Sequence, residues 1–375
     1  MKRVERLRGV LRQGALLGAL LLAGCGSGNE PAVGNPAAGS PATASCAPAE
    51  LDALYQQVKA SGENRVVVYS STVDTEFEPL WLEFQKDYPE LRVVYMMVAS
   101  SQIMSRVAAE RATGNHMGDV LMQTADVLPE LKKGDYLSAY VPPTAAALDE
   151  HLRDPDGYVH YGLYKLYGLA YNTRLVQEQD LPEHFTDVFA PRWHERFSYV
   201  QPLGPVANTD AAFATLWRDG VVDRDALYQL RQAGTYSFPE AGISYVAQGR
   251  QLLNLWAYLP PLARQLELGA PVAIRFTPEF STLVPYGLAI TAQAPHPNAA
   301  RLLTAWLFSE RGQQALAERS YMLGSMPGAP APAFFPRELL DDPAFHRPSS
   351  PAELLEQMKA LRPVFADVFL TPKQP

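Results

Sequence analysis

The most constraining feature of this 375-residue chain is an alternation of short β-branched runs with amphipathic segments between residues 66 and 134. Val66-Val67-Val68 is typical of a buried strand, and residues 93–98 and 119–122 repeat the pattern. Between these runs, apolar residues recur at helical spacing. Such alternation predicts an α/β fold with parallel strands, right-handed crossovers and helices on both faces of the sheet.

A second region of strands and helices follows the first. Because 375 residues exceed what one hydrophobic core usually serves, we expect two domains. Asn298 is predicted to cap a helix near the end of this region. Strands are predicted at 167–171, 197–201, 252–259, 272–276 and 284–292, and helices at 210–217, 261–268 and 351–361.

The N-terminus has a composition of its own. A basic start precedes an apolar run, Ala15 to Leu22, that is far shorter than the roughly 20 residues of a membrane-spanning helix. Residues 25–47 are rich in Gly, Pro, Ala and Ser and are predicted to form a flexible linker. Cys25 follows Leu-Ala-Gly, which resembles the lipobox of bacterial lipoproteins. That resemblance implies a signal peptide over 1–24, lipid attachment at Cys25, and a periplasmic or extracytoplasmic protein anchored to a membrane. An ordinary signal peptide is the alternative.

Charge and motif content exclude several classes of function. The net charge of −8 argues against nucleic acid as a partner. The seven histidines are scattered, and none has the spacing of a metal-binding pair. We find no nucleophile elbow and no phosphate-binding loop. We therefore predict no catalytic residue, no metal and no cofactor, although a hydrolase stays open as an alternative.

Small polar residues follow three successive predicted strands, each just before a helix. The carboxyl ends of parallel strands form the ligand crevice of open α/β sheets, and free N–H groups at a helix start suit an anion. The alternative is that these side chains only cap their helices. The residues are Ser70, Ser71 and Thr72 after the first strand, Ser100 and Ser101 after the second, and Thr124 and Asp126 after the third.

The second region offers fewer candidates. Asn208 and Thr209 have the same form as the helix starts above, with the same ambiguity. Tyr258 and Tyr286 belong to a rich set of aromatic residues that serve either as core or as cleft lining. We expect all four to face the ligand from the second lobe or from crossing strands.

Several segments carry a resemblance to a known family. They read VVVYSS, GDVLMQTAD, YGLAYNTRLV, DVFAPRWHERF and VPYGLAITAQAPHPNAARLLTAWLFSERGQQAL. The chain resembles the extracellular solute-binding lipoproteins of ABC importers, family 1-like, which are related to ferric-ion-, phosphonate- and thiamine-binding periplasmic proteins. The resemblance implies a two-lobed type II periplasmic-binding-protein fold, in which each lobe is a sheet with helices on both faces and crossing strands join the lobes. The expected boundaries are 48–145 with 283–325 for lobe one, and 146–282 with 326–375 for lobe two.

The resemblance also implies a function and leaves alternatives open. It implies a non-catalytic protein that closes around a small solute and presents it to an ABC permease and its ATPase, and we expect it to be a monomer. The ferric branch of the family uses adjacent tyrosines near residues 254–258, where this chain has only Tyr258. The hydroxyl-rich helix starts fit an anion such as a phosphonate, phosphate ester or carboxylate. The alternatives are a ferric-ion-binding importer component, a ligand sensor for a histidine kinase and an extracytoplasmic enzyme.

Overall fold

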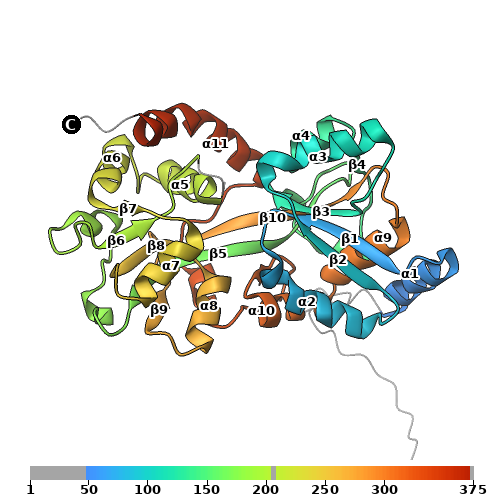
Figure 1. Ribbon diagram of the computed structural model, residues 1–375, viewed down its shortest axis with the longest axis horizontal. Helices are drawn as coiled ribbons and strands as arrows, with labels where there is room; N and C mark the ends of the chain where they lie inside the picture. Colours follow the sequence, from blue (N-terminus) through green and yellow to red (C-terminus); the bar gives the residue numbers. More distant parts are fainter. Residues whose placement is uncertain (1–47, 204–207, 372–375) are drawn as a thin grey trace, which may run out of the picture. The chain divides into compact units, whose positions relative to one another are not determined.

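The computed structural model describes residues 48–203 and 208–371, which form helices and strands as drawn in Figure 1. The predicted signal peptide, Cys25 and the linker over 25–47 lie outside the described residues. The strands are β1 (Arg65–Ser70), β2 (Arg92–Met97), β3 (Val120–Thr124), β4 (Leu137–Ser138), β5 (His160–Asn172), β6 (Phe197–Tyr199), β7 (Thr235–Tyr236), β8 (Leu253–Tyr258), β9 (Val272–Arg275), β10 (Thr282–Thr291) and β11 (Leu323–Gly324). The helices are α1 (Pro48–Ser61), α2 (Asp74–Asp87), α3 (Ser100–Thr113), α4 (Leu128–Lys133), α5 (Asn208–Arg218), α6 (Arg224–Ala233), α7 (Pro239–Ala247), α8 (Leu259–Glu267), α9 (Pro297–Leu307), α10 (Glu310–Ser320) and α11 (Pro351–Phe365).

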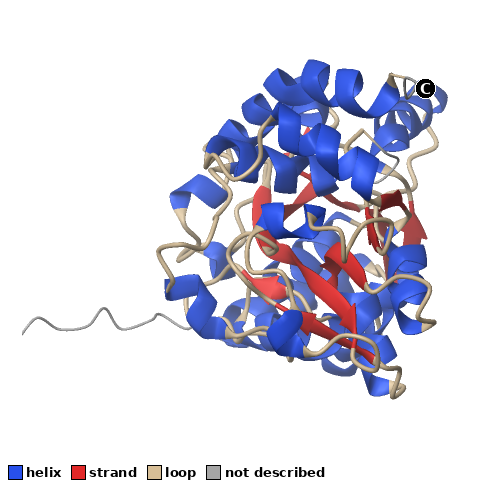
Figure 2. Cartoon of the chain, turned by 90° about the vertical axis from the view of Figure 1, so that its left-hand side faces the viewer, coloured by secondary structure: helices blue, strands red, loops and turns tan. Residues whose placement is uncertain are grey.

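Alternate residues of β1 pack into two different hydrophobic cores. Val66 and Val68 lie in the same core as Phe77 of α2. Val67 and Tyr69 lie in the core that contains Ile103 of α3. Since successive side chains of a strand point to opposite faces, α2 and α3 cover opposite faces of the sheet. Figure 2 shows helices on both sides of the strands, as the sequence predicted.

The strands form one continuous sheet in the order β2-β1-β3-β10-β5-β8-β6-β7. Strands β1, β2 and β3 are parallel, as predicted. The prediction of a parallel sheet is wrong beyond them, because β10 lies antiparallel between β3 and β5. Strand β10 enters this position from the second region of the chain and runs in the opposite direction to β3. The second region is also mixed, since β6 is parallel to β8 and β5 is antiparallel to it.

Strands β5 and β10 are the longest of the described strands and lie at the centre of the sheet (Figure 1). The predicted strand at 167–171 is only the second part of β5. The first part of β5 pairs with β10 and β11, and the second part pairs with β8 and β9. These two strands therefore join the two halves of the sheet. The lobe boundaries given above stay a prediction. In the second region of the chain, helix α11 packs against α5.

The start of α9 differs from the prediction. The helix begins at Pro297 with His296 at the N-cap, so the prediction that Asn298 caps it is wrong. The Glu63 carboxylate takes that role, accepting from Asn298 Nδ2 at 2.8 Å and from the backbone N–H of Ala299 at 2.7 Å. A carboxylate at this end satisfies free N–H groups and complements the helix dipole. Among the described helices, none has the length and apolar character that crossing a membrane would need.

Candidate functional site

The hydroxyl group of Tyr286 on β10 is the centre of a buried polar cluster. Its Oη donates to the backbone carbonyl of Met122 at 2.6 Å and accepts from the backbone N–H of Ser71 at 3.0 Å. The hydroxyls of Ser70 and Ser71 lie 2.8 and 2.9 Å from the same oxygen, and Thr72 Oγ1 lies 3.4 Å from it. A phenol oxygen that already donates can accept about two hydrogen bonds. Four donor groups therefore compete for one weak acceptor.

Lys165 on β5 adds a positive charge to this cluster. Its side chain is buried, with 2% of the residue exposed, and Nζ donates to Thr72 Oγ1 at 2.7 Å. Nζ also lies 4.2 Å from the centroid of the Tyr286 ring. Among the described residues, no carboxylate oxygen lies within 4 Å of this ammonium group. Burying a charge without a partner of opposite charge is costly, so the ammonium favours the approach of an anion.

We name Ser70, Ser71, Thr72, Lys165 and Tyr286 the Tyr286 cluster. Its hydroxyls come from the end of β1, where a buried strand turns into α2, and its cation and phenol come from the two central strands. The cluster combines hydroxyl, amide and ammonium donors in a buried place. Such donor sets bind oxygen atoms of phosphonates, phosphate esters and carboxylates.

Glu76 and Tyr258 lie beside the Tyr286 cluster. Burial raises the pKa of Glu76 to about 7, and the nearby charge of Lys165 opposes that rise. Tyr258, on β8, faces Tyr167 of β5 with ring centroids 5.1 Å apart, and Lys165 Nζ lies 5.5 Å from the centroid of the Tyr258 ring. The Tyr258 hydroxyl and the Glu76 carboxylate are close together without a hydrogen bond of good geometry between them.

The polar residues at the helix starts do not act as helix caps. The N-cap residues of α2, α3 and α4 are Val73, Ala99 and Val127, and none makes a side-chain capping bond. The hydroxyls of Ser70, Ser71 and Thr72, at the end of β1 and in the turn before α2, lie near the Tyr286 hydroxyl instead. The capping alternative therefore does not account for Ser70, Ser71 or the other candidates at these three helix starts.

The second and third strand ends form a separate group. Ser100 Oγ donates to Gln123 Oε1 at 3.1 Å and lies 3.3 Å from Thr124 Oγ1. We name these three residues the Ser100 cluster. Thr124 is opposite Tyr286 in the β3–β10 register, so the two clusters are neighbours. Ser101 is exposed and takes no part in either.

Asp126 lies where β3 ends against α5 and α11. Its Oδ1 is buried without a hydrogen-bond partner among the described residues. Burial raises the pKa of Asp210 at the start of α5 to about 6, and the charge of Asp126 adds to that rise. A cavity of only about 10 Å³ separates Asp126 from Ala211 and Met358. That space is no larger than one water molecule needs, so the contact is nearly closed.

Thr209 and Asn208 are the remaining predicted residues. Thr209 is buried, but its hydroxyl donates to the backbone carbonyl of Gln201 at 3.3 Å rather than to either cluster. Asn208 is the first residue of α5, and its side chain lies outside the described residues.

Sequence and structure comparisons identify the family. A profile described as "Bacterial extracellular solute-binding protein" matches residues 115–349, which is more than half of the chain. The chain belongs to this family of bacterial extracellular solute-binding proteins. This result confirms the resemblance found in the sequence, and the family is a class of solute-binding proteins. A search of curated protein sequences gives no match.

Solved structures show the fold of this solute-binding protein. Iron-bound HitA from Pseudomonas aeruginosa has a TM-score of 0.68 at 22% identity, covering 81% of this chain and 99% of HitA. AfuA from Actinobacillus pleuropneumoniae, a periplasmic binding protein with fructose-6-phosphate bound, gives 0.66 at 18% identity, covering 83% of this chain and all of AfuA. A substrate-binding protein of an ABC transporter from Agrobacterium tumefaciens gives 0.67 at 16% identity, covering 81% and 96%. The predicted type II periplasmic-binding-protein fold is confirmed.

Two residues of the candidate site were missed in the sequence. Lys165 is the only charged side chain in the strand HYGLYKLYGLAYN, and a lone charge in a buried aromatic strand is the signal that could have found it. Glu76 is a buried acid in the first turn of α2, and its spacing gives no signal because acids are common there.

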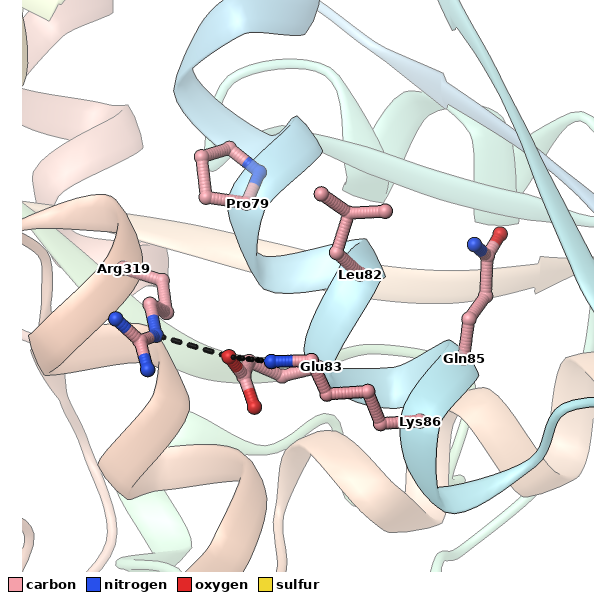
Figure 3. Close-up of a pocket in the computed structure, with 6 residues that line it drawn as sticks. All are labelled: Pro79, Leu82, Glu83, Gln85, Lys86 and Arg319. Atoms are coloured by element: carbon pink, nitrogen blue, oxygen red, sulfur yellow. Dashed lines mark hydrogen bonds and ion pairs between the residues drawn. The ribbon is translucent and has the colours of Figure 1, made fainter.

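A separate pocket of about 490 Å³ lies beside α2 (Figure 3). Glu83 at its wall binds Lys86 at 2.8 Å, Arg311 at 2.6 Å and Arg319 at 3.0 Å. These contacts, led by the one to Lys86, lower the pKa of Glu83. Because Lys86 and Arg319 already share this carboxylate, we assign the pocket no ligand. Within the described part of the chain, no group of three or more His, Cys, Asp or Glu residues could hold a metal ion.

Proposed function

We propose that this solute-binding protein captures a small organic anion at the Tyr286 cluster and passes it to an ABC permease and ATPase. One observation carries the proposal: four hydrogen-bond donors converge on a single phenol oxygen, and a buried ammonium group binds one of them, the Thr72 hydroxyl. An oxyanion has more lone pairs and more negative charge than a phenol, so it binds such donors more strongly. Lys165 supplies the charge, and the hydroxyls of Ser70, Ser71 and Thr72 supply direction.

The position of the cluster supports capture by closure. Tyr286 and Lys165 lie on β10 and β5, the strands that join the two halves of the sheet. A solute that binds both strands and the end of β1 would favour the arrangement in which they come together. Binding of fructose-6-phosphate by AfuA, a protein of the same fold, is consistent with an anionic solute here.

A ferric ion is the rival ligand, because HitA is iron-bound and Tyr258, Tyr286 and Tyr167 bring three phenols close together. Phenolates are good donors to ferric iron. The ammonium of Lys165 lies within 6 Å of two of these rings, however, and a positive charge there repels a trivalent cation. We therefore favour the anion.

The proposed cellular setting follows from the N-terminal sequence. We propose that the signal peptide over 1–24 is removed and that Cys25 carries the lipid, so that the linker over 25–47 tethers a monomeric binding protein to the membrane. The support is the Leu-Ala-Gly-Cys pattern and the Gly- and Pro-rich composition that follows it.

Calorimetry tests the proposed ligand class. We expect the protein to bind at least one of five anions: ethylphosphonate, 2-aminoethylphosphonate, 3-phosphoglycerate, fructose 6-phosphate and succinate. We expect no binding of ferric citrate. Ser71→Asp places a carboxylate among the donors, so it should abolish anion binding by charge repulsion. Binding of the ferric species alone would overturn the proposal, and unchanged anion affinity in Ser71→Asp would remove this turn from the site.

A further inference from the structure

Glu76 and Tyr258 each hold a buried oxygen atom without a hydrogen-bond partner. Only 4% of Glu76 and 5% of Tyr258 is exposed. Glu76 Oε2 and Tyr258 Oη make no hydrogen bond of good geometry with any described residue, although the two groups lie close enough for each to shift the pKa of the other. A buried polar atom left without a partner destabilises the folded protein. Two such atoms side by side point to a group that binds both of them.

These two oxygens border the Tyr286 cluster. Glu76 lies in the first turn of α2, directly after the turn that holds Ser71 and Thr72. Lys165 Nζ lies over the rings of both Tyr258 and Tyr286. A small solute whose anionic group binds at Lys165 would therefore also reach the neighbourhood of Glu76.

Charge balance indicates what that part of the solute carries. An anion at Lys165 neutralises the ammonium and leaves Glu76 facing additional negative charge. A positive group beside Glu76 removes this conflict. A primary ammonium has three N–H donors, enough for both unpartnered oxygens. Hydrogen bonds between an ammonium and a carboxylate are among the strongest in proteins.

Resting on the proposed function, we infer that the solute is a zwitterion: its anionic group binds the Tyr286 cluster, and a primary ammonium on the same molecule binds Glu76 and Tyr258. The assignment makes Glu76 the residue that selects an amine-bearing anion over an otherwise identical one. It also explains why an acid is buried near the residues that attract the anion.

The surroundings of Glu76 give a second measurable consequence. Burial holds its pKa at about 7, and a bound ammonium would lower that pKa, so binding near neutral pH should release a fraction of a proton. Calorimetry in buffers of different ionisation enthalpy measures this release. The other charged or titratable groups that act on Glu76 are Lys165 on β5, Tyr258 on β8, Glu240 on α7 and Arg264 on α8, with Tyr95 and Tyr167 nearby.

Three matched compounds test the inference on the full-length protein: 2-aminoethylphosphonate, 2-hydroxyethylphosphonate and ethylphosphonate. We expect the amine to bind at least tenfold more tightly than either analogue, with proton release only for the amine. Glu76→Gln should remove the preference without weakening ethylphosphonate. Glu240→Gln, which alters an exposed acid in the same neighbourhood, should retain it.

The outcomes separate this inference from the proposed function. Equal binding of the hydroxyl compound or of ethylphosphonate would overturn the zwitterion and leave the anion site intact. Binding of fructose 6-phosphate by a protein that binds none of the three phosphonates would do the same. Failure of every anion, including those above, would overturn both. Retention of the amine preference in Glu76→Gln would overturn the role of Glu76.

Discussion

The Tyr286 cluster and the Ser100 cluster look alike in sequence and differ in chemistry. Both contain small polar residues where a parallel strand meets a helix. In the Ser100 cluster, the hydroxyls of Ser100 and Thr124 pair with each other and with Gln123, so their hydrogen bonds are satisfied locally. In the Tyr286 cluster, the donors exceed the capacity of their shared acceptor, and a buried ammonium lies among them.

The difference comes from the strands that cross to the other half of the sheet. A strand end supplies only hydroxyls and N–H groups. Lys165 and Tyr286 reach the end of β1 because β5 and β10 pass through the centre of the sheet. A binding site of this kind depends on which strands become neighbours more than on the local motif.

The largest effect is expected from removing Lys165, the positive charge that distinguishes the Tyr286 cluster from the Ser100 cluster. Lys165→Met should lower the affinity for 2-aminoethylphosphonate at least 100-fold, which corresponds to about 3 kcal/mol, because the anion loses its charge partner. Calorimetry measures the loss, and circular dichroism should show a folded variant. Lys86→Met, which alters an exposed lysine on α2, should bind as the unaltered protein does. If Lys165→Met lost less than threefold in affinity, the charge of Lys165 would not distinguish the Tyr286 cluster from the Ser100 cluster.

The second prediction compares two buried acids without solute: Glu76, beside the Tyr286 cluster, and Asp210, near Asp126 at the start of α5. The pKa of Glu76 is raised from 4.5 to about 7, so the folded state binds more protons than the unfolded state between these values. The contribution of Glu76 to the free energy of unfolding is therefore greatest below about pH 4.5 and is lost as the pH rises to about 7. Glu76→Gln should leave stability nearly unchanged at pH 4 and raise it by up to about 3 kcal/mol at pH 8.

Asp210 provides the matched variant for that measurement. Its pKa is raised from 3.8 to about 6. The gain in the free energy of unfolding of Asp210→Asn should therefore be complete by about pH 6. Urea denaturation of the solute-free protein across pH 4–8 gives both curves. If the gain in the free energy of unfolding continued to grow between pH 6 and 8 in Asp210→Asn but not in Glu76→Gln, the two pKa assignments would have to be exchanged.

The smallest effects concern single hydroxyls at the two kinds of strand end. Ser71→Ala removes one of the competing donors and should weaken 2-aminoethylphosphonate about tenfold, or about 1.4 kcal/mol, since a hydrogen bond to a charged group is lost. Ser101→Ala, at the exposed start of α3, should change the affinity less than twofold. Calorimetry under one set of conditions compares them, and similar losses would show that the α3 start also contacts the solute.

Much of the fold could be predicted from the sequence because local patterns determine it. The β-branched run of β1 and the apolar face of α2 indicated their structure and burial directly. The antiparallel entry of β10 between β3 and β5 could not be predicted, because periodicity does not state which strands pair. The N-cap of α9 was missed for a related reason: its capping carboxylate is Glu63, more than 200 residues away.

The site was predictable only in part for the same physical reason. Ser70, Ser71, Thr72 and Tyr286 were chosen separately, and the structure brings them together at one oxygen. Whether the hydroxyl donors at a strand end outnumber their acceptors depends on the partners that the other strands supply. The positions of Lys165 and Glu76 gain meaning only when β5 and α2 are seen to be neighbours.

The insertion of β10 between β3 and β5 also affects when the protein can fold. Met122 and Tyr286 are 164 residues apart in the chain, yet they are hydrogen-bonded in the finished sheet. Non-local pairing of this kind slows folding, and at ordinary rates of synthesis β10 emerges on the order of ten seconds after β3. Until then β3 has an open edge of apolar residues that can pair with another chain. The entry of β10 thus completes the Tyr286 cluster and also covers the edge of β3 at which a nascent chain is prone to aggregate.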